Sequence, residues 1–105
     1  MLASGGRDHQ AVVFLLNEQR YALKLSVVGR IVRAVEVTGL PKAPEIVLGV
    51  IRIEGRIIPV MNMRKRLHLP EKEIDLSDQF LIAQTARRIV ALEVDAVLGV
   101  VDYDE

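Results

Sequence analysis

The chain lacks cysteine and tryptophan altogether, and aromatic residues make up only 4% of its 105 residues. The absence of cysteine excludes disulfide bonds, thiolate metal sites and cysteine nucleophiles, and it agrees with a reducing compartment. Apolar runs such as residues 11–16 are far shorter than the roughly 20 residues that span a bilayer. The N-terminal residues contain no apolar segment of signal-peptide length. We therefore expect a cytoplasmic protein without membrane insertion.

The chain also lacks a net charge, because Lys+Arg and Asp+Glu both number 14. No overall field attracts nucleic acid or anionic lipid. Half of the residues are hydrophobic, and the abundance of valine, isoleucine and leucine predicts an aliphatic core. The length allows one domain, which we expect over residues 11–105, after a flexible N-terminal segment at residues 1–10.

Short β-rich runs separated by turn residues predict a mainly all-β fold. The alternation of Tyr21, Leu23 and Leu25 with polar or small residues is typical of a half-buried strand. We expect strands at residues 11–16, 21–25, 30–37, 80–84 and 88–94, and residues 95–101 are again apolar. Short helical turns are expected after Ser26 and at residues 62–67 with Asn62 as the cap, and a polar, mobile connection is expected at residues 68–79.

Residues 49–61 form the most informative segment, because two β-rich runs flank Glu54, Gly55 and Arg56. This pattern predicts a tight hairpin in which Gly55 takes a positive φ angle. Pro59 has no amide hydrogen, so it should lie at a sheet edge or face away from the ladder. We expect that Gly49, Gly55 and Gly99 serve turns of the backbone and do not contact a partner.

No arrangement of residues indicates catalysis. His9 and His68 lie in polar segments without metal-ligand spacing. The serines Ser4, Ser26 and Ser77 lack a Gly-x-Ser-x-Gly context, and the glycines form no phosphate-binding loop. We therefore expect no enzyme, no cofactor and no metal site.

Charged residues lie close together at two places in the sequence, and we interpret both groups as exposed to solvent. Glu93 and Asp95 fall on one side of a strand, where they could divide acid and base roles, but an exposed ionic face is the favoured interpretation. Arg64, Lys65 and Arg66 are expected to face water from a short helix.

Residues 48–64 read Leu-Gly-Val-Ile-Arg-Ile-Glu-Gly-Arg-Ile-Ile-Pro-Val-Met-Asn-Met-Arg. This run resembles the central hairpin of CheW-like domains, Gly-Val-x-Asn-Leu-Arg-Gly-x-Val-x-Pro-Val-x-Asp-Leu-Arg. Residues 14–28 resemble the opening hairpin of that family, residues 40–50 its proline loop, and residues 94–100 its Val-Asp-x-Val-x-Gly-Val signature. The likeness covers residues 11–101 in the family's order.

The resemblance implies two small SH3-like β-barrels packed together. It also implies a non-catalytic chemotaxis adaptor that couples methyl-accepting chemoreceptors to a CheA-type histidine kinase. An aliphatic barrel suits such a role, because grooves between its strands accept a partner's helix or strand edge.

This chain departs from the family pattern in its charges. Arg30 stands where the family usually has Glu, and Glu54 stands where the family has the Arg of Asn-Leu-Arg-Gly. The two residues either form a pair of reversed polarity or are unrelated surface substitutions. Arg52 and Asn62 replace the Asn and Asp of the same motif. We predict a partner-binding set of Arg30, Arg52, Glu54, Arg56 and Asn62.

The chain is also shorter than the family pattern, so we expect the second part of the fold to be incomplete. Unpaired strand edges would then favour a dimer or higher oligomer, by strand exchange between subunits. A smaller barrel that closes by itself is the alternative.

Two other functions stay open. One is a degenerate, self-associating relative that no longer couples receptor and kinase. The other is a small nucleic-acid-binding barrel, against which the neutral charge argues; it would use Arg52, Arg56, Arg64, Lys65 and Arg66.

Overall fold

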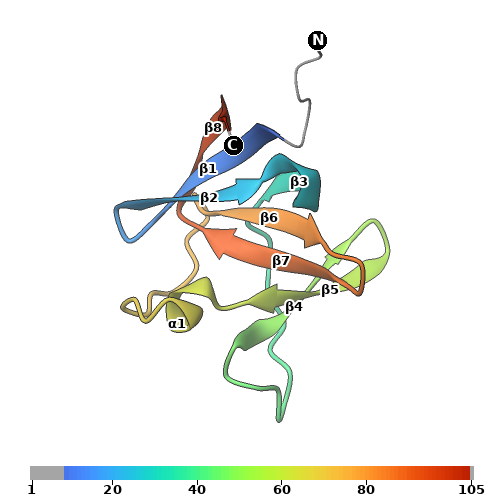
Figure 1. Cartoon of the computed structure of the whole chain (residues 1–105). Coiled ribbons are helices and arrows are strands. Elements are labelled where there is room, and N and C mark those ends of the chain that lie inside the picture. Colours follow the sequence, from blue (N-terminus) through green and yellow to red (C-terminus); the bar gives the residue numbers. More distant parts are fainter. Residues whose placement is uncertain (1–8, 105) are drawn as a thin grey trace.

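The structure, a computed structural model, describes residues 9–104 and consists mainly of strands (Figure 1). This confirms the predicted all-β class. The strands are β1 (Gln10–Leu16), β2 (Gln19–Lys24), β3 (Val28–Arg33), β4 (Val47–Ile53), β5 (Arg56–Met61), β6 (Gln79–Gln84), β7 (Ile89–Val94) and β8 (Ala96–Asp102). Two short helical turns are η2 (Leu25–Val27) and α1 (Met63–Arg66).

Most of the segment expected to be flexible lies outside the described residues. Of residues 1–10, the structure describes His9 and Gln10. Gln10 begins β1, and the His9 carbonyl accepts a hydrogen bond from the Tyr103 amide at 3.0 Å.

The smaller sheet has three strands in the order β2-β1-β8, and β1 pairs antiparallel with both neighbours. A two-residue turn joins β1 to β2, and both of its residues, Asn17 and Glu18, have positive φ angles of 53° and 66°. Two successive left-handed residues match the right-handed twist of a hairpin.

The larger sheet has five strands in the order β3-β6-β7-β5-β4. Only β5 and β7 are parallel; the other pairs are antiparallel. Its outer strands, β3 and β4, are linked at two points. The Thr38 and Val50 backbones exchange two hydrogen bonds of 2.9 Å, and Arg30 forms an ion pair with Glu54 at 2.9 Å. The sheet is thereby drawn together along its open side, which we call the barrel seam.

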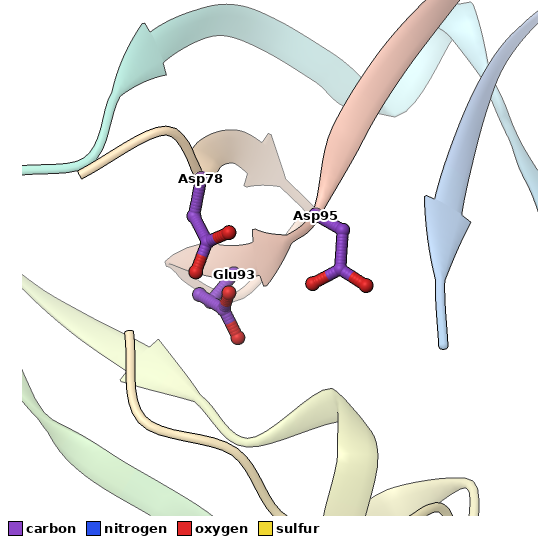
Figure 2. Close-up of side chains that lie close together, drawn as sticks. All are labelled: Asp78, Glu93 and Asp95. Atoms are coloured by element: carbon purple, nitrogen blue, oxygen red, sulfur yellow. The ribbon is translucent and has the colours of Figure 1, made fainter. Parts of the chain in front are cut away.

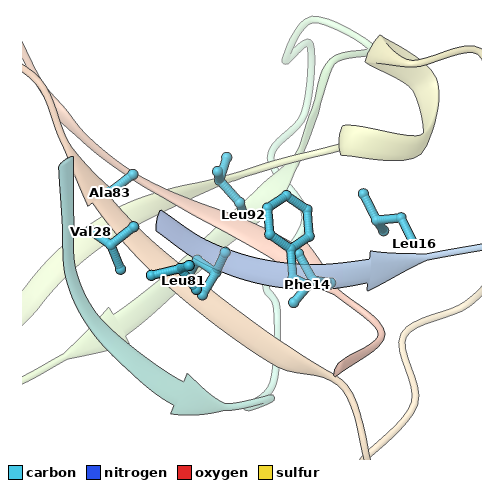
Figure 3. Close-up of a cluster of buried hydrophobic side chains, with 8 residues drawn as sticks. Phe14, Leu16, Val28, Leu81, Ala83 and Leu92 are labelled. Carbon is cyan, nitrogen blue, oxygen red and sulfur yellow. The ribbon is translucent and has the colours of Figure 1, made fainter. Parts of the chain in front are cut away.

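Strand β6 is buried on both faces, and it separates two aliphatic cores. Phe80 and Ile82 pack with Ile51, Ile58, Val60 and Ala91 inside the five-stranded sheet. Leu81 and Ala83 point the other way, because successive side chains of a strand alternate between faces. They pack against Val12, Phe14, Leu16, Val28, Leu92 and Val94, which joins the two sheets (Figure 3).

The central hairpin forms as predicted. Glu54 and Gly55 make its turn with φ angles of 51° and 81°. Pro59 lies opposite Val50, whose own amide and carbonyl bond to Thr38 on the other side of β4. Pro59 therefore faces away from the hydrogen bonds of the β4–β5 ladder. On its other side, the pairing of β5 with β7 begins at Val60.

Gly49 and Gly99 do not lie in turns as expected. They lie within β4 and β8, beside register shifts that insert one extra residue into the strand. A Cβ atom on Gly49 would lie 2.3 Å from the Thr38 carbonyl oxygen. Glycine at this position therefore allows the close approach of the two backbones at the barrel seam.

Other boundaries differ locally from expectation. The strand predicted at residues 30–37 begins at Val28 and ends at Arg33; the Ala34 amide makes one more bond in the same register, to the carbonyl of Asp78 just before β6. Ser26 lies inside η2 rather than capping it. Asn62 caps α1 as predicted, since its Oδ1 accepts a hydrogen bond from the Lys65 amide at 3.0 Å.

Candidate interaction site and buried ionic cluster

The predicted partner-binding residues lie mostly at one end of the five-stranded sheet. Arg30 lies on β3, Arg52 on β4, Glu54 in the hairpin turn and Arg56 at the start of β5, and all four are exposed. Arg30, Glu54 and Arg56 line a shallow hollow of about 170 Å³. The structure thus brings three of the five together and places Arg52 beside them.

Of the two alternatives left open for Arg30 and Glu54, the structure shows the pair of reversed polarity. Their Nη1 and Oε1 atoms are 2.9 Å apart, and the two side chains are 48% and 75% exposed. An ion pair as open as this contributes only about 0.2–1 kcal/mol to stability. Its main effect is to join β3 to the hairpin turn and to fix two opposite charges on the surface.

Asn62 does not belong to this surface. It is buried, and six residues of nearly extended chain, roughly 20 Å, separate it from Arg56. Its Oδ1 caps α1, and its Nδ2 donates to the Glu71 carboxylate at 3.2 Å. The side chain is therefore occupied in holding the helix and residue 71.

Two further arginines at this end were missed in the sequence. Arg87 and Arg88 lie in the connection between β6 and β7, and they line a hollow of about 360 Å³ together with Arg56 and Ile57. Ile57 is 56% exposed. We call the whole area the hairpin-end surface, which comprises Arg30, Arg52, Glu54, Arg56, Ile57, Arg87 and Arg88.

A cluster of buried charges lies where α1 meets β7, contrary to the expectation that these residues face water. Arg64 is 4% exposed; its Nη1 lies 3.2 Å from Glu93 Oε1 and its Nη2 lies 2.5 Å from Asp95 Oδ1. The Asn62 cap fixes the orientation of α1, and a rotation of about 100° per residue turns Arg64 inward while Lys65 and Arg66 point outward. Figure 2 shows the carboxylates of this cluster.

The buried position of Arg64 also weakens the nucleic-acid alternative. Lys65 is paired with Glu45 at 3.0 Å, next to α1, while Arg52 and Arg56 lie at the hairpin end. The five cations that this alternative requires do not form one accessible surface.

The polar segment at residues 68–79 is fastened to the same cluster. Lys72 Nζ lies 3.2 Å from Asp78 Oδ2, and Asp78 is only 2% exposed. The Asp75 amide donates to the same Asp78 oxygen at 2.8 Å. This anchoring contrasts with the mobile connection expected from composition.

The cluster shifts the acidities of its members in opposite directions. Burial, followed by a hydrogen bond and the charge of Asp78, raises the pKa of Glu93 to about 8. Its Oε2 atom is buried without a hydrogen-bond partner, so the ionised form of this carboxyl is poorly stabilised. Burial alone would raise the pKa of Asp95, but hydrogen bonds from Arg64 and the Asn17 amide outweigh it and lower that pKa.

Asp78, Glu93 and Asp95 each offer a carboxylate oxygen within 4.8 Å of the others. Such a spacing suits a cation, but Arg64 and Lys72 already contact these oxygens. Two cationic side chains, three carboxyls and one proton on Glu93 leave the group electrically balanced. We interpret the cluster as an internal ion network that ties α1 and residues 72–78 to the end of β7.

Two packed β-sheets define a small, mainly β protein of the barrel class. The family model of the CheW-like domain matches residues 10–105, and the chain belongs to this family. The fold agrees with a solved structure described as the scaffolding protein TtCheW from Thermoanaerobacter tengcongensis, with a TM-score of 0.85 and 33% identity over 93% of this chain and 67% of that one.

Relatives described as chemotaxis protein CheW include those of Rhizobium meliloti, 31% identical over 104 residues, and Thermotoga maritima, 32% identical over 104 residues. The matches cover 99% of this chain, and 66% and 68% of these relatives. The Bacillus subtilis protein is 35% identical over 82 residues, or 53% of its length. The chain thus spans about half to two thirds of the relatives it matches. Within residues 9–104, no helix has the length and apolar character that crossing a membrane requires.

Proposed function

We propose that this protein is a chemotaxis signal-transduction adaptor that couples chemoreceptors to a CheA-type histidine kinase. The observation that supports this most is the hairpin-end surface, where exposed charges surround the exposed side chain of Ile57. It is built on the hairpin that carries the family motif. A rigid sheet that presents an apolar contact within a charged rim has the composition of a protein-binding site.

We propose that the adaptor is not an enzyme. The carboxyl with the most perturbed pKa, Glu93, is buried and paired with Arg64 and Asp78 inside the protein. Perturbed acidities also occur in structural ion networks. The proposed partners place the protein in the cytoplasm.

The reversed Arg30–Glu54 pair has a consequence for partner choice. A kinase domain matched to the usual polarity would meet like charges at these two positions, and like charges disfavour binding. We therefore expect the protein to prefer a kinase whose contact surface carries the complementary, reversed pattern.

Binding of a CheA-type regulatory domain to the full chain tests the proposal. We expect saturable binding that weakens about tenfold or more when Arg56 is changed to Glu. The matched control is Arg20→Glu, an exposed arginine on β2 away from the hairpin end. Equal binding by all three proteins would contradict a role for this surface.

We also propose that the chain self-associates through the edge of its smaller sheet. Among the strands of residues 9–104, β8 pairs with β1 alone, and Leu98, Val100 and Val101 on it are 48%, 49% and 47% exposed. An unpaired apolar edge favours pairing with a second copy or strand exchange between subunits. Light scattering at high micromolar concentration should report a dimer or larger species, and a clean monomer mass would contradict this.

A further inference from the structure

A groove of about 780 Å³ lies at the end of the five-stranded sheet opposite the hairpin-end surface. It is lined by residues 34–37 after β3, by Leu48 on β4, and by residues 71–76. Arg30, which contacts the hairpin turn, is the third residue of β3, whereas the groove begins at Ala34, just after the strand ends. We call this feature the acidic groove.

The walls of the acidic groove are aliphatic and partly open to solvent. Val35 is 43% exposed and Leu76 is 89% exposed, while Val37, Leu48 and Ile74 lie deeper and contact the aliphatic core of the five-stranded sheet. Exposure of apolar side chains around a concave surface is typical of a binding site.

The rim of the groove carries one sign of charge. Glu36, Glu71, Glu73 and Asp75 are all exposed and line it. The cation among them, Lys72, directs its Nζ to the buried Asp78 at 3.2 Å, so its charge is offset from inside. An occupant with lysine or arginine beside its apolar residues would be complementary to this rim.

The backbone on one side of the groove has unused hydrogen-bonding groups. Backbone hydrogen bonds hold Ala34 to Asp78 and Thr38 to Val50, and within the described residues none is found for the three residues between them. Unpaired backbone groups beside a sheet are the feature that partners use when they add a strand to a protein.

We propose that the acidic groove binds an extended segment of a partner protein in which aliphatic residues alternate with lysine or arginine. Aliphatic side chains on one face fill the groove between Val35 and Leu76, and basic side chains on the other face meet Glu36 and Glu73. The proposal rests on the adaptor function, because it supplies a second binding surface, with charge opposite to that of the basic hairpin end.

Titration of the ¹⁵N-labelled full chain with a synthetic peptide of alternating lysine and valine tests the proposal by NMR. We expect saturable shifts confined to residues 34–37, 48 and 71–76, and weaker binding at higher salt. A peptide of alternating glutamate and valine, and one of alternating lysine and serine, should bind at least about tenfold more weakly, since each lacks one of the two interactions.

Variants separate the groove from the rest of the adaptor. Glu36→Lys with Glu73→Lys should weaken binding of the lysine-valine peptide roughly tenfold, because two attractions become repulsions. Arg56→Glu should leave it unchanged. Circular dichroism verifies that each variant is folded, and binding of the kinase regulatory domain at the hairpin end should survive the groove substitutions.

Three results would overturn the proposal. One is the absence of saturable shifts in the groove, and another is equal binding of the glutamate-valine peptide. The third is concentration-dependent broadening of groove signals without peptide, which would identify a second copy of this chain as the occupant. If groove binding fails while kinase binding persists, the adaptor function stands and only this inference falls.

Discussion

Arg30 and Glu54 lie 2.9 Å apart at the barrel seam and join the edge strand β3 to the turn between β4 and β5. The motif that the central hairpin resembles implies the opposite order of the two charges. The two residues are 24 positions apart in the sequence. Because their side chains are in contact, reversal of the charge at one of them alone would place like charges together.

Exchange of the two charges tests this relationship. Arg30→Glu and Glu54→Arg should each lower the free energy of unfolding by about 0.2–1 kcal/mol, because the pair is exposed. The double variant should recover most of the loss, as expected for residues in direct contact. Urea unfolding of the four proteins provides the measurement, and losses that simply add would show that the pair is not coupled.

Gly49→Ala tests the close approach at the barrel seam. The added Cβ would lie 2.3 Å from the Thr38 carbonyl oxygen and 2.8 Å from Val37 Cγ1, so the backbones must separate. We expect a loss of about 1–3 kcal/mol in the free energy of unfolding.

The matched control for Gly49 is Gly39→Ala. A Cβ at Gly39 meets nothing within 4 Å, and alanine there should leave stability unchanged or raise it by up to about 1 kcal/mol. Similar effects of the two substitutions would contradict the seam contact.

Arg64→Met tests the buried ionic cluster. Removal of this cation leaves the ionised Asp95 without its charged partner and the Glu93 carboxyl without a hydrogen bond, and breaking a buried pair costs about 3–5 kcal/mol. Arg66→Met, an exposed neighbour on the same helix, should change stability by less than about 0.5 kcal/mol. Thermal or urea unfolding distinguishes the two, and a neutral Arg64→Met would show that the cluster is not coupled to folding.

The raised pKa of Glu93 predicts a pH dependence of stability. The folded protein holds a proton on this carboxyl up to about pH 8, whereas its ordinary pKa is 4.5. The corresponding stability is present below pH 4.5 and is lost as the pH rises through about 8. Asp95 acts oppositely, since its lowered pKa contributes stability that is lost as the pH falls below its ordinary value.

Glu93→Gln isolates this effect, because glutamine imitates the protonated carboxyl. The free energy of unfolding of the wild type should fall between about pH 5.5 and pH 8.5, and that of the variant should change much less. Parallel profiles for the two proteins would assign the pH dependence to other groups.

The sequence predicted the elements that depend on local rules. The hairpin followed from two β-rich runs around Glu54 and Gly55, and the start of α1 from the capping preference of Asn62. Pro59 faces away from the ladder as its missing amide required. The family motif predicted the fold, whereas the exchanged charges left open whether Arg30 and Glu54 are in contact.

Contacts between distant segments were beyond sequence reasoning. Arg64, Lys65 and Arg66 are all cationic, so the sequence alone does not distinguish them. The packing of α1 on β7 determines that Arg64 is buried. Arg87 joins Arg56 because the strand order places the β6–β7 connection beside the central hairpin. Figure 1 shows these two turns at the same end of the sheet.

The proposed adaptor must hold a receptor and a kinase together, and simultaneous capture tests this requirement most directly. Immobilised cytoplasmic receptor fragment is incubated with the CheA-type regulatory domain, with and without the full chain. We predict that the kinase domain is retained only when the chain is present, and that Arg56→Glu abolishes retention while Arg20→Glu preserves it. Retention that is independent of the chain, or none with the wild type, would contradict the account.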